Sequence, residues 1–537
     1  MSEGAVKKEE KPRKFQAIRG TRDLLPPETA FWNRVEQTAH EVFATFGFGE
    51  IRVPIFEPTE LFARAVGGDT DIVSKEMYTF EDHDFSDLDK LRTILLFRAP
   101  DIYNLHSISL YKNQLAEFLA AFEAGLAKSE MPIPSTPDNR RALENLQKLV
   151  TSINFILQDF DSTPQVLARF DLRVDEARQA LRVISFGDVL SLRPEATASV
   201  CRAYIEHGMN SVPQPVKLYY MGPMFRRERP QKGRYRQFYQ IGAEVLGGSD
   251  APAIDAEVIE MVMTFFDRLD LQGVQLELNS IGCRECRPKY VELLRAELLK
   301  VKDKLGADSQ RRIETNPLRV LDSKLESEQG IIATLPHIAD HLCEDCKTHY
   351  AAVKHQLEMR GVIYRENWRL VRGLDYYMRT TFEITAHGLG SQNAVCGGGR
   401  YDGLVELLGG PATKGIGFAI GEDRLILSLQ ESGKAPAAQG RDVYIAWMGD
   451  RAHATAIRAA KDLRKAGFSV ELPPVELKFG KALGQADKLG ARYALILGDN
   501  EVAEGLWTLK TLADGSQTKF TEADLIEHLR KSNQVSS

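Results

Sequence analysis

The segment Met224–Phe238 (MFRRERPQKGRYRQF) constrains this chain more than any other stretch of its sequence. Six cations fall between Arg226 and Arg236, in a chain whose net charge is −6, and aromatic residues and Gly233 interrupt the run. The pattern predicts two strands joined by a basic loop. Because guanidinium groups match phosphate oxygens, such a loop suits polyphosphate or a nucleic-acid backbone. A solvated basic surface is the alternative interpretation.

The rest of the composition is that of an ordinary globular protein. At 537 residues the chain is too long for one simple core, so several domains are expected. No apolar run reaches the ~18 residues that a membrane span needs. Residues 1–14 lack the apolar core of a secretory signal and predict a disordered tail. Six cysteines do not make a disulfide scaffold, which favours a cytoplasmic protein.

Residues 84–186 differ from the flanking sequence in the spacing of their apolar residues. Apolar residues recur at intervals of three and four over 108–122, 143–160 and 167–184. This is the helical period, and it predicts a helical insertion. A connection of this length folds on its own rather than as a loop.

The C-terminal part shows alternating strands and helices. Residues 431–440 read as a linker. Beyond it, strands are predicted at 442–447, 469–472 and 493–497, and helices at 452–466 and 480–489. The alternation predicts a small α/β domain over 441–537. Near the N-terminus, a helix is expected over 27–46 and a strand over 50–56.

Four further segments are rich in chemically active residues: Ser191–Thr197, Leu370–Thr380, Cys396–Gly403 and Gly417–Leu425. Each alone has a structural explanation. The glycines at 397–399 fit a tight turn, and the tyrosines at 376–377 fit a core. Their order along one chain is more specific than any one of them.

Taken together, these segments resemble the histidyl-tRNA synthetases, a family of class II aminoacyl-tRNA synthetases. Residues 226–238 look like class II motif 2, residues 46–57 look like motif 1, and residues 417–425 look like motif 3. The histidine-specific signatures are matched by 372–377 and 398–403, and further resemblance lies at 18–26 and 486–497.

The resemblance implies an α+β fold: a class II antiparallel-sheet catalytic domain with helical insertions and a C-terminal α/β anticodon-binding domain. The catalytic domain would comprise residues 15–83, 187–274 and 361–430, with helical insertions at 84–186 and 275–360 and the anticodon-binding domain at 441–537.

The resemblance also implies an activity. Members of this family activate histidine with ATP and Mg²⁺, release pyrophosphate, and transfer histidine to tRNA(His). The reaction depends mostly on positioning and charge stabilisation. A cytoplasmic homodimer that pairs through motif 1 is expected.

For ATP, the resemblance assigns the α-phosphate to Arg226, the adenine to Phe238 and Glu228, and the terminal phosphates to Arg234 and Arg424. All five belong to the motif 2 and motif 3 segments.

Arg372 is where the family places a catalytic guanidinium. It would bridge the histidine carboxylate and the α-phosphate, work that a metal ion does in related enzymes. The alternative for Arg372 is a structural ion pair with Asp375.

The resemblance assigns histidine to a polar set of side chains. Glu195, Thr197 and Gln240 would hold the α-amino group, and Glu244, Tyr376, Tyr377 and Tyr401 complete the histidine-binding residues. Imidazole offers two ring nitrogens. A carboxylate that accepts from a ring N–H would reject apolar side chains. Two departures from the family are Ala196, where glycine is usual, and Asp423, where glutamate is frequent.

Two CxxC pairs, Cys283/Cys286 and Cys343/Cys346, lie in the expected insertion at 275–360. Four such thiolates can bind structural zinc. The spacing of common zinc ribbons is not met, so the expectation is four thiols without metal, with zinc as the alternative.

Three other functions compete. A synthetase-like regulatory subunit of histidine biosynthesis would bind without catalysis, but it typically lacks the C-terminal domain and the arginine signature around Arg372. Another class II synthetase, for proline, threonine or glycine, would lack Leu374–Tyr377. A simple nucleic-acid-binding protein would leave Glu195, Glu244 and Arg372 without a role.

Overall fold

The computed structural model describes residues 15–67, 70, 72–82, 188–388, 393–433 and 440–534, with scattered positions between 148 and 176. The expected tail at 1–14, most of the insertion at 84–186 and most of the linker lie outside the described residues. The chain divides into two compact units, one of Met1–Asp23 with Val35–Lys434 and one of Leu24–Arg34 with Ala435–Ser537.

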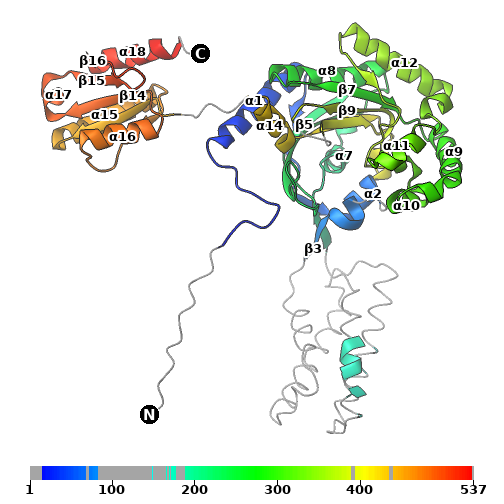
Figure 1. Cartoon of the computed structure of the whole chain (residues 1–537). Helices are drawn as coiled ribbons and strands as arrows, with labels where there is room; N and C mark the ends of the chain where they lie inside the picture. The colour runs from blue at the N-terminus through cyan, green and yellow to red at the C-terminus, as the bar shows by residue number, and fades with distance from the viewer. Residues whose placement is uncertain are drawn as a thin grey trace. The chain divides into compact units, whose positions relative to one another are not determined.

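An eight-stranded sheet forms the centre of the first unit (Figure 1). In order across the sheet, its strands are β1 (Gly49–Glu50), β5 (Val216–Phe225), β6 (Gln237–Leu246), β11 (Gly415–Gly421), β10 (Ala394–Arg400), β9 (Met378–Thr385), β7 (Gln275–Ser280) and β8 (Arg365–Glu366). Pairing is antiparallel from β5 to β7 and parallel at the two edges. The sheet therefore agrees with the expected antiparallel architecture.

Strand alternation gives this sheet one apolar and one polar face. On β6, Ile241, Ala243 and Val245 are buried apolar residues, while Gln240 and Glu244 face the other side. Helices α1 (Glu28–Thr45) and α8 (Pro252–Arg268) contribute aromatic rings to the apolar face, where Phe43 contacts the rings of Tyr219, Phe265 and Phe418. The polar face is left for the candidate site.

A small three-stranded sheet lies below (Figure 1), with order β2 (Phe56–Pro58), β4 (Asp188–Leu192), β3 (Tyr78–Asp82). Asp82 pairs directly with Asp188. The chain from 83 to 187 therefore leaves and returns at neighbouring positions on two antiparallel strands.

The prediction of a strand over residues 50–56 was wrong in its extent. Only Gly49–Glu50 and Phe56–Pro58 join ladders. The carbonyls of Val53 and Pro54 instead accept from Arg193 Nη1, at 2.7 and 3.3 Å. Pro54 has no N–H to give to a ladder, so a buried guanidinium replaces strand pairing here.

The region expected to be helix-rich at 275–360 begins with a strand of the central sheet, β7. Helices α9 (Cys286–Lys300), α10 (Ala307–Thr315), α11 (Glu326–Ile332) and α12 (Glu344–Met359) follow it. In Figure 1, α9, α10 and α11 gather at one end of the sheet, and α12 packs on α8. The core of this unit continues into these helices through Leu294, Leu298, Ile313 and Ile332.

The other labelled helices among the described residues of the first unit are short. They are α2 (Thr59–Val66), α7 (Thr197–Glu206), α13 (Leu404–Leu407) and α14 (Glu422–Glu431), with single turns at Ile72–Glu76, Met209–Ser211, Lys302–Lys304, Pro317–Val320 and Ile338–His341.

The second unit is an α/β layer structure. Its five-stranded sheet has the order β13 (Val470–Glu471), β12 (Val443–Met448), β14 (Tyr493–Gly498), β15 (Trp507–Thr511), β16 (Gln517–Phe520), and its helices are α15 (Asp450–Lys465), α16 (Phe479–Lys488), α17 (Asp499–Glu504) and α18 (Glu522–Gln534). The five elements expected between 442 and 497 are present. Among the described helices, none is both long and apolar enough to span a bilayer.

Candidate active site

A cavity of about 280 Å³ opens on the polar face of the central sheet. Its wall contains most of the residues that the sequence singled out: Glu195, Thr197, Arg226, Glu228, Arg234, Phe238, Gln240, Arg372, Tyr376, Tyr377 and Arg424. Glu244 and Tyr401 are not in this wall. They lie behind it, where Glu244 accepts hydrogen bonds from both Thr197 and Tyr401.

The basic run forms the strand–loop–strand that its pattern predicts. β5 and β6 pair from Val216–Leu246 to Phe225–Gln237, and the loop is closed by Arg226 N–H donating to Arg236 O at 2.9 Å. Arg226 Nε donates to the Pro194 carbonyl at 2.9 Å. Its guanidinium lies 5.2 Å from the Phe238 ring centre. Arg226 is thus held in place at the edge of the cavity.

Two more cations converge on the same cavity. Arg234 pairs with Glu228 at 3.1 Å, and Arg424 Nη1 donates to the Ala394 carbonyl at 2.7 Å. Burial, and secondarily repulsion from Arg234, lower the pKa of Arg424. Two guanidinium groups that repel each other across a cavity are stabilised by an anion between them. The arrangement suits a polyphosphate.

Arg372 enters the cavity from the segment before β9. Its Nη1 pairs with Glu383 Oε2 at 3.0 Å, so the ion pair considered with Asp375 is replaced by one with Glu383. Its buried Nε has no hydrogen-bond partner. A buried donor without a partner is costly, and a ligand acceptor would remove that cost.

Glycine at 397 makes room for Arg372. A Cβ on Gly397 would lie 2.1 Å from Arg372 Nη2. Residues 397–399 lie inside β10, so the tight-turn interpretation of this glycine run was wrong. Close approach of a side chain to the strand explains at least the first of the three glycines.

We expect Gly397→Ala to lower the rate of the chemical step by about 10²-fold, because a displacement of about 1 Å at a reacting group can cost that much. The substitution leaves the Arg372 charge in place and moves it. Single-turnover kinetics measure the effect. Gly330→Ala is the control, since a Cβ on Gly330 meets nothing within 4 Å. An unchanged rate in Gly397→Ala would contradict the packing argument.

Glu195 and Gln240 lie deeper in the cavity. The Glu195 carboxylate accepts from the backbone N–H groups of Thr197 at 2.7 Å and Ala198 at 3.0 Å, at the N-terminus of α7. Burial raises the pKa of Glu195 despite these bonds. The buried Gln240 Oε1 has no hydrogen-bond partner. An acceptor pair of this kind suits a cationic donor such as an ammonium group.

Glu244 is almost fully buried behind this pair. Its two oxygens accept from Thr197 Oγ1 at 2.7 Å and from Tyr401 Oη at 2.6 Å. Burial raises the pKa of Glu244 to about 8, although both hydrogen bonds oppose the shift. Gly417 opposite on β11 leaves room for it, since a Cβ there would lie 1.7 Å from Glu244 Oε2.

The two departures from the family pattern are accommodated. Ala196 is fully buried in the apolar core and is absent from the cavity wall. Asp423 accepts from Tyr239 N–H at 2.9 Å and from Arg22 Nη2 at 3.1 Å. The shorter aspartate therefore ties the segment around Arg22 to the edge of β6.

Sequence reasoning missed Glu383, the ion-pair partner of Arg372. Glu383 lies on β9 and lines the cavity. Its position in Thr380–Thr385, an otherwise uncharged part of the strand that follows the Arg372 segment, was an available signal.

The CxxC cysteines lie outside this cavity but close to each other. Their four Sγ atoms fall within 4.8 Å of one another. Cys201 and Cys396 are buried and free.

Comparisons with known proteins identify the family of this chain. A family model described as "Histidyl-tRNA synthetase" matches residues 167–425, beginning within the segment expected as an insertion. A second model, "Anticodon binding domain", matches residues 442–532. The catalytic fold and the C-terminal domain together define an aminoacyl-tRNA synthetase of class II.

Proteins named histidine–tRNA ligase from Solibacter usitatus and Koribacter versatilis are each 45% identical to this chain, over 96% of it and 99% and 96% of their own lengths. A crystal structure of apo Staphylococcus aureus histidyl-tRNA synthetase is 30% identical with a TM-score of 0.65, covering 96% of this chain and all of that one. The chain belongs to the histidyl-tRNA synthetase family, and the expected α+β class II fold is confirmed.

Proposed function

We propose that this enzyme activates L-histidine with ATP to histidyl-adenylate and then transfers histidine to the 3′ end of tRNA(His). One observation carries the assignment to this cavity. Gln240 Oε1 is an acceptor without a partner and Arg372 Nε is a donor without a partner, and both residues line the same cavity as Arg226, Arg234 and Arg424. An amino acid brings the complementary ammonium and carboxylate groups.

In the first step, a histidine carboxylate oxygen attacks the ATP α-phosphorus, and the bond to the leaving pyrophosphate breaks. Arg226 and Arg372 stabilise the negative charge that develops at that phosphorus. Because Pro194 and Glu383 already hold these two guanidinium groups, little reorganisation is needed during the reaction.

ATP lies along the row of residues from β6 to α14 in this proposal. Phe238 stacks on the adenine, Glu228 contacts it, and Arg234 and Arg424 hold the terminal phosphates. Mg²⁺ bound with those phosphates would neutralise part of their charge. Of the four carboxylates in the wall, Glu228 and Glu383 are the two that would hold Mg²⁺ together with phosphate oxygens.

Histidine lies deeper, toward β11. Glu195, Thr197 and Gln240 bind the α-amino group, and Tyr376 and Tyr377 flank the side chain. Glu244 and Tyr401 are hydrogen-bonded to each other here, and in the proposed complex Glu244 turns one oxygen to an imidazole N–H. This makes the imidazole pocket polar, as a site for histidine must be.

The transfer step follows once the adenylate has formed. A terminal ribose hydroxyl of the tRNA attacks the histidyl carbonyl carbon, and AMP leaves. The domain at 442–532 supports anticodon binding. A cytoplasmic homodimer that pairs through residues 46–57 is part of the proposal.

The test is ATP–pyrophosphate exchange with the full chain. Histidine should stimulate exchange, and the other amino acids should not. A regulatory subunit would bind histidine without exchange. Folded, pure protein that shows no histidine-dependent exchange contradicts the proposal.

The segment from 83 to 187 is predicted to be dispensable for activation. Because Asp82 and Asp188 are paired, an Asn-Gly turn can join them as a hairpin. The truncated enzyme is expected to keep histidine-dependent exchange at the rate of the full chain. Aminoacylation of tRNA, measured separately, tells whether the segment serves the second step. Loss of exchange in a folded truncated protein would show that the segment supports the cavity itself.

A further inference from the structure

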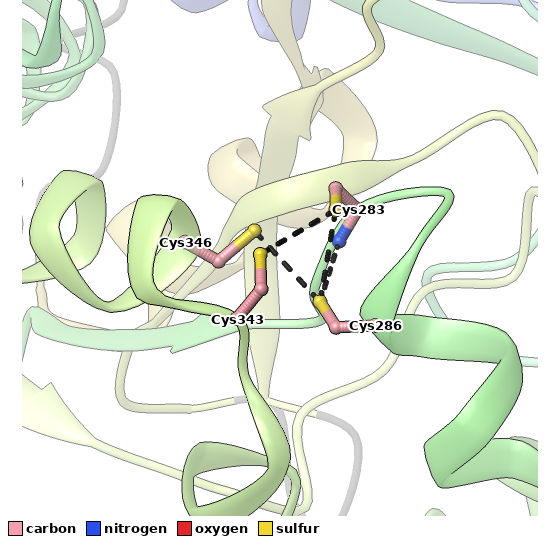
Figure 2. Close-up of side chains that lie close together, drawn as sticks. All are labelled: Cys283, Cys286, Cys343 and Cys346. Carbon is pink, nitrogen blue, oxygen red and sulfur yellow. Dashed lines mark hydrogen bonds between the residues drawn. The ribbon is translucent and has the colours of Figure 1, made fainter.

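Four cysteines from two distant parts of the chain meet beside the central sheet. Cys283 and Cys286 lie between the end of β7 and the first turn of α9, and Cys343 and Cys346 lie at the start of α12. Figure 2 shows the four thiols pointing toward a common centre. All four Sγ atoms lie within 4.8 Å of one another, although 56 residues separate Cys286 from Cys343.

The distances between the sulfurs match those of a metal tetrahedron. Sγ–Sγ separations are 3.7 Å for Cys283–Cys286, 3.8 Å for Cys283–Cys343 and 3.9 Å for Cys286–Cys346. Zn–S bonds of about 2.3 Å at tetrahedral angles place sulfurs about 3.8 Å apart. A disulfide needs about 2.05 Å. The cluster therefore has the geometry of a tetrathiolate site and not of two disulfides.

Backbone N–H groups are directed at two of the four sulfurs. The backbone N–H of Cys283 donates to Cys286 Sγ at 3.2 Å, and the N–H of Glu285 donates to Cys283 Sγ at 3.4 Å. Hydrogen bonds to the ligand atoms orient them and stabilise their charge. α9 begins at Cys286 and α12 begins directly after Cys343, so the positive end of a helix lies at each CxxC pair.

We propose that Cys283, Cys286, Cys343 and Cys346 bind one Zn²⁺ as a structural ion. Four protein ligands close the tetrahedron and leave no position for water or substrate, which is the mark of a structural site. The expectation of four thiols without metal rested on the long spacing between the pairs. That spacing ceases to matter once the fold brings β7 and α12 together.

The ion would tie the helical region to the histidine pocket, an extension that rests on the proposed function. The loop carrying Cys283 is paired with the strand after the tyrosines: Gly282 O accepts from Arg379 N–H at 2.8 Å. Arg287 Nη1 donates to the Tyr377 carbonyl at 2.6 Å. Cys283 and Tyr377 also share the wall of a second cavity, of about 400 Å³. Fixing α9 and α12 to each other therefore holds the backbone of Tyr377.

The first experiment measures metal in the full-length protein, purified without chelators or a polyhistidine tag. Elemental analysis should find one zinc per chain, and a mercurial reagent should release it with loss of the four thiolates. Co²⁺ added to the zinc-depleted protein should give the ligand-field and charge-transfer bands of a tetrahedral tetrathiolate site. Absence of zinc together with absence of these bands overturns the proposal, as does iron in place of zinc or the loss of four free thiols to disulfides.

Variants then assign the ion to these residues. Cys286→Ser and Cys346→Ser should each lose most of the zinc, whereas Cys201→Ala, a lone buried cysteine elsewhere in the core, should keep it. Full zinc content in both serine variants overturns the assignment. If the serine variants do not fold, the cobalt spectrum of the wild-type protein tests whether cysteines bind the ion, because it identifies sulfur ligands directly.

A kinetic readout separates the positioning effect from the proposed function. Zinc-depleted protein is expected to show a raised KM for histidine, with the KM for ATP little changed, because Tyr377 faces the amino acid. Equal changes in both constants would overturn the link to Tyr377. The metal content itself does not depend on any activity, so failure of the proposed function would leave that result standing.

Discussion

Replacing Arg372 with alanine is expected to lower the rate of histidyl-adenylate formation by about 10²- to 10³-fold, the usual cost of removing one group that stabilises a transition-state charge. The Kd for ATP should change little, because Arg226, Arg234 and Arg424 remain in the cavity wall. Single-turnover adenylate formation and calorimetric ATP titration measure the two quantities. The buried, unpartnered Nε of Arg372 is the physical reason for expecting so large an effect.

Two further variants sharpen this result. Arg372→Lys keeps the charge but loses the planar fork, so it should recover only part of the rate. Arg360→Ala removes an arginine of similar burial that pairs with Glu260 away from the cavity, and it should leave the rate unchanged. If Arg372→Ala activates histidine at the wild-type rate, the catalytic role given to Arg372 is wrong.

Replacing Glu244 with alanine is the second large expected effect. kcat/KM for histidine should fall by about 10²-fold. The variant loses a hydrogen bond to a charged group and also leaves the partners of that group unpaired. Thr197 and Tyr401 both lose their acceptor in this variant. Pyrophosphate exchange at varied histidine concentrations measures the fall in kcat/KM. Glu257→Gln, at a residue paired with Lys217, is the control.

The raised pKa of Glu244 predicts that histidine affinity depends on pH. Its pKa of about 8 means that the free enzyme holds this carboxyl protonated at pH 7. A histidine N–H that donates to the carboxylate lowers that pKa, so binding releases a proton below pH 8. Histidine affinity should therefore rise between pH 7 and pH 8 and then level off. The free imidazole, with a pKa of about 6.5, is mostly neutral throughout this window.

Calorimetry in buffers of different ionisation enthalpy measures the released proton, and Glu244→Gln should abolish the release. An affinity that falls as pH rises through 8 would mean that Glu244 acts as a donor. In that case the protonated carboxyl gives its hydrogen to the ring, and the assignment of Glu244 as an acceptor is wrong.

Much of the candidate site was predictable because its residues lie in short continuous segments. The strand–loop–strand around Arg226 follows from local alternation and charge, and Phe238, Gln240 and Glu244 are fixed on one face by the two-residue period of β6. The alternating strands and helices after residue 441 were likewise predictable, because each element has its own hydrophobic periodicity.

Other features depend on contacts between segments far apart in the chain. Glu383 as the partner of Arg372 follows from the pairing of β9 with β10, which places Gly397 under the guanidinium. The broken strand at 51–55 follows from Arg193, which takes the carbonyls that a neighbouring strand would otherwise bind. Neither contact can be predicted from the sequence of a single segment.

The sequence by itself determined the chemistry that is available: six cations around one glycine, a guanidinium at 372, a carboxylate at 244 and two separated CxxC pairs. The tertiary structure decided what those groups face. It placed Glu244 behind Thr197, where burial raises its pKa, and it brought four distant thiols to tetrahedral spacing. Burial and long-range proximity arise from packing the whole sheet, so they are absent from any single segment.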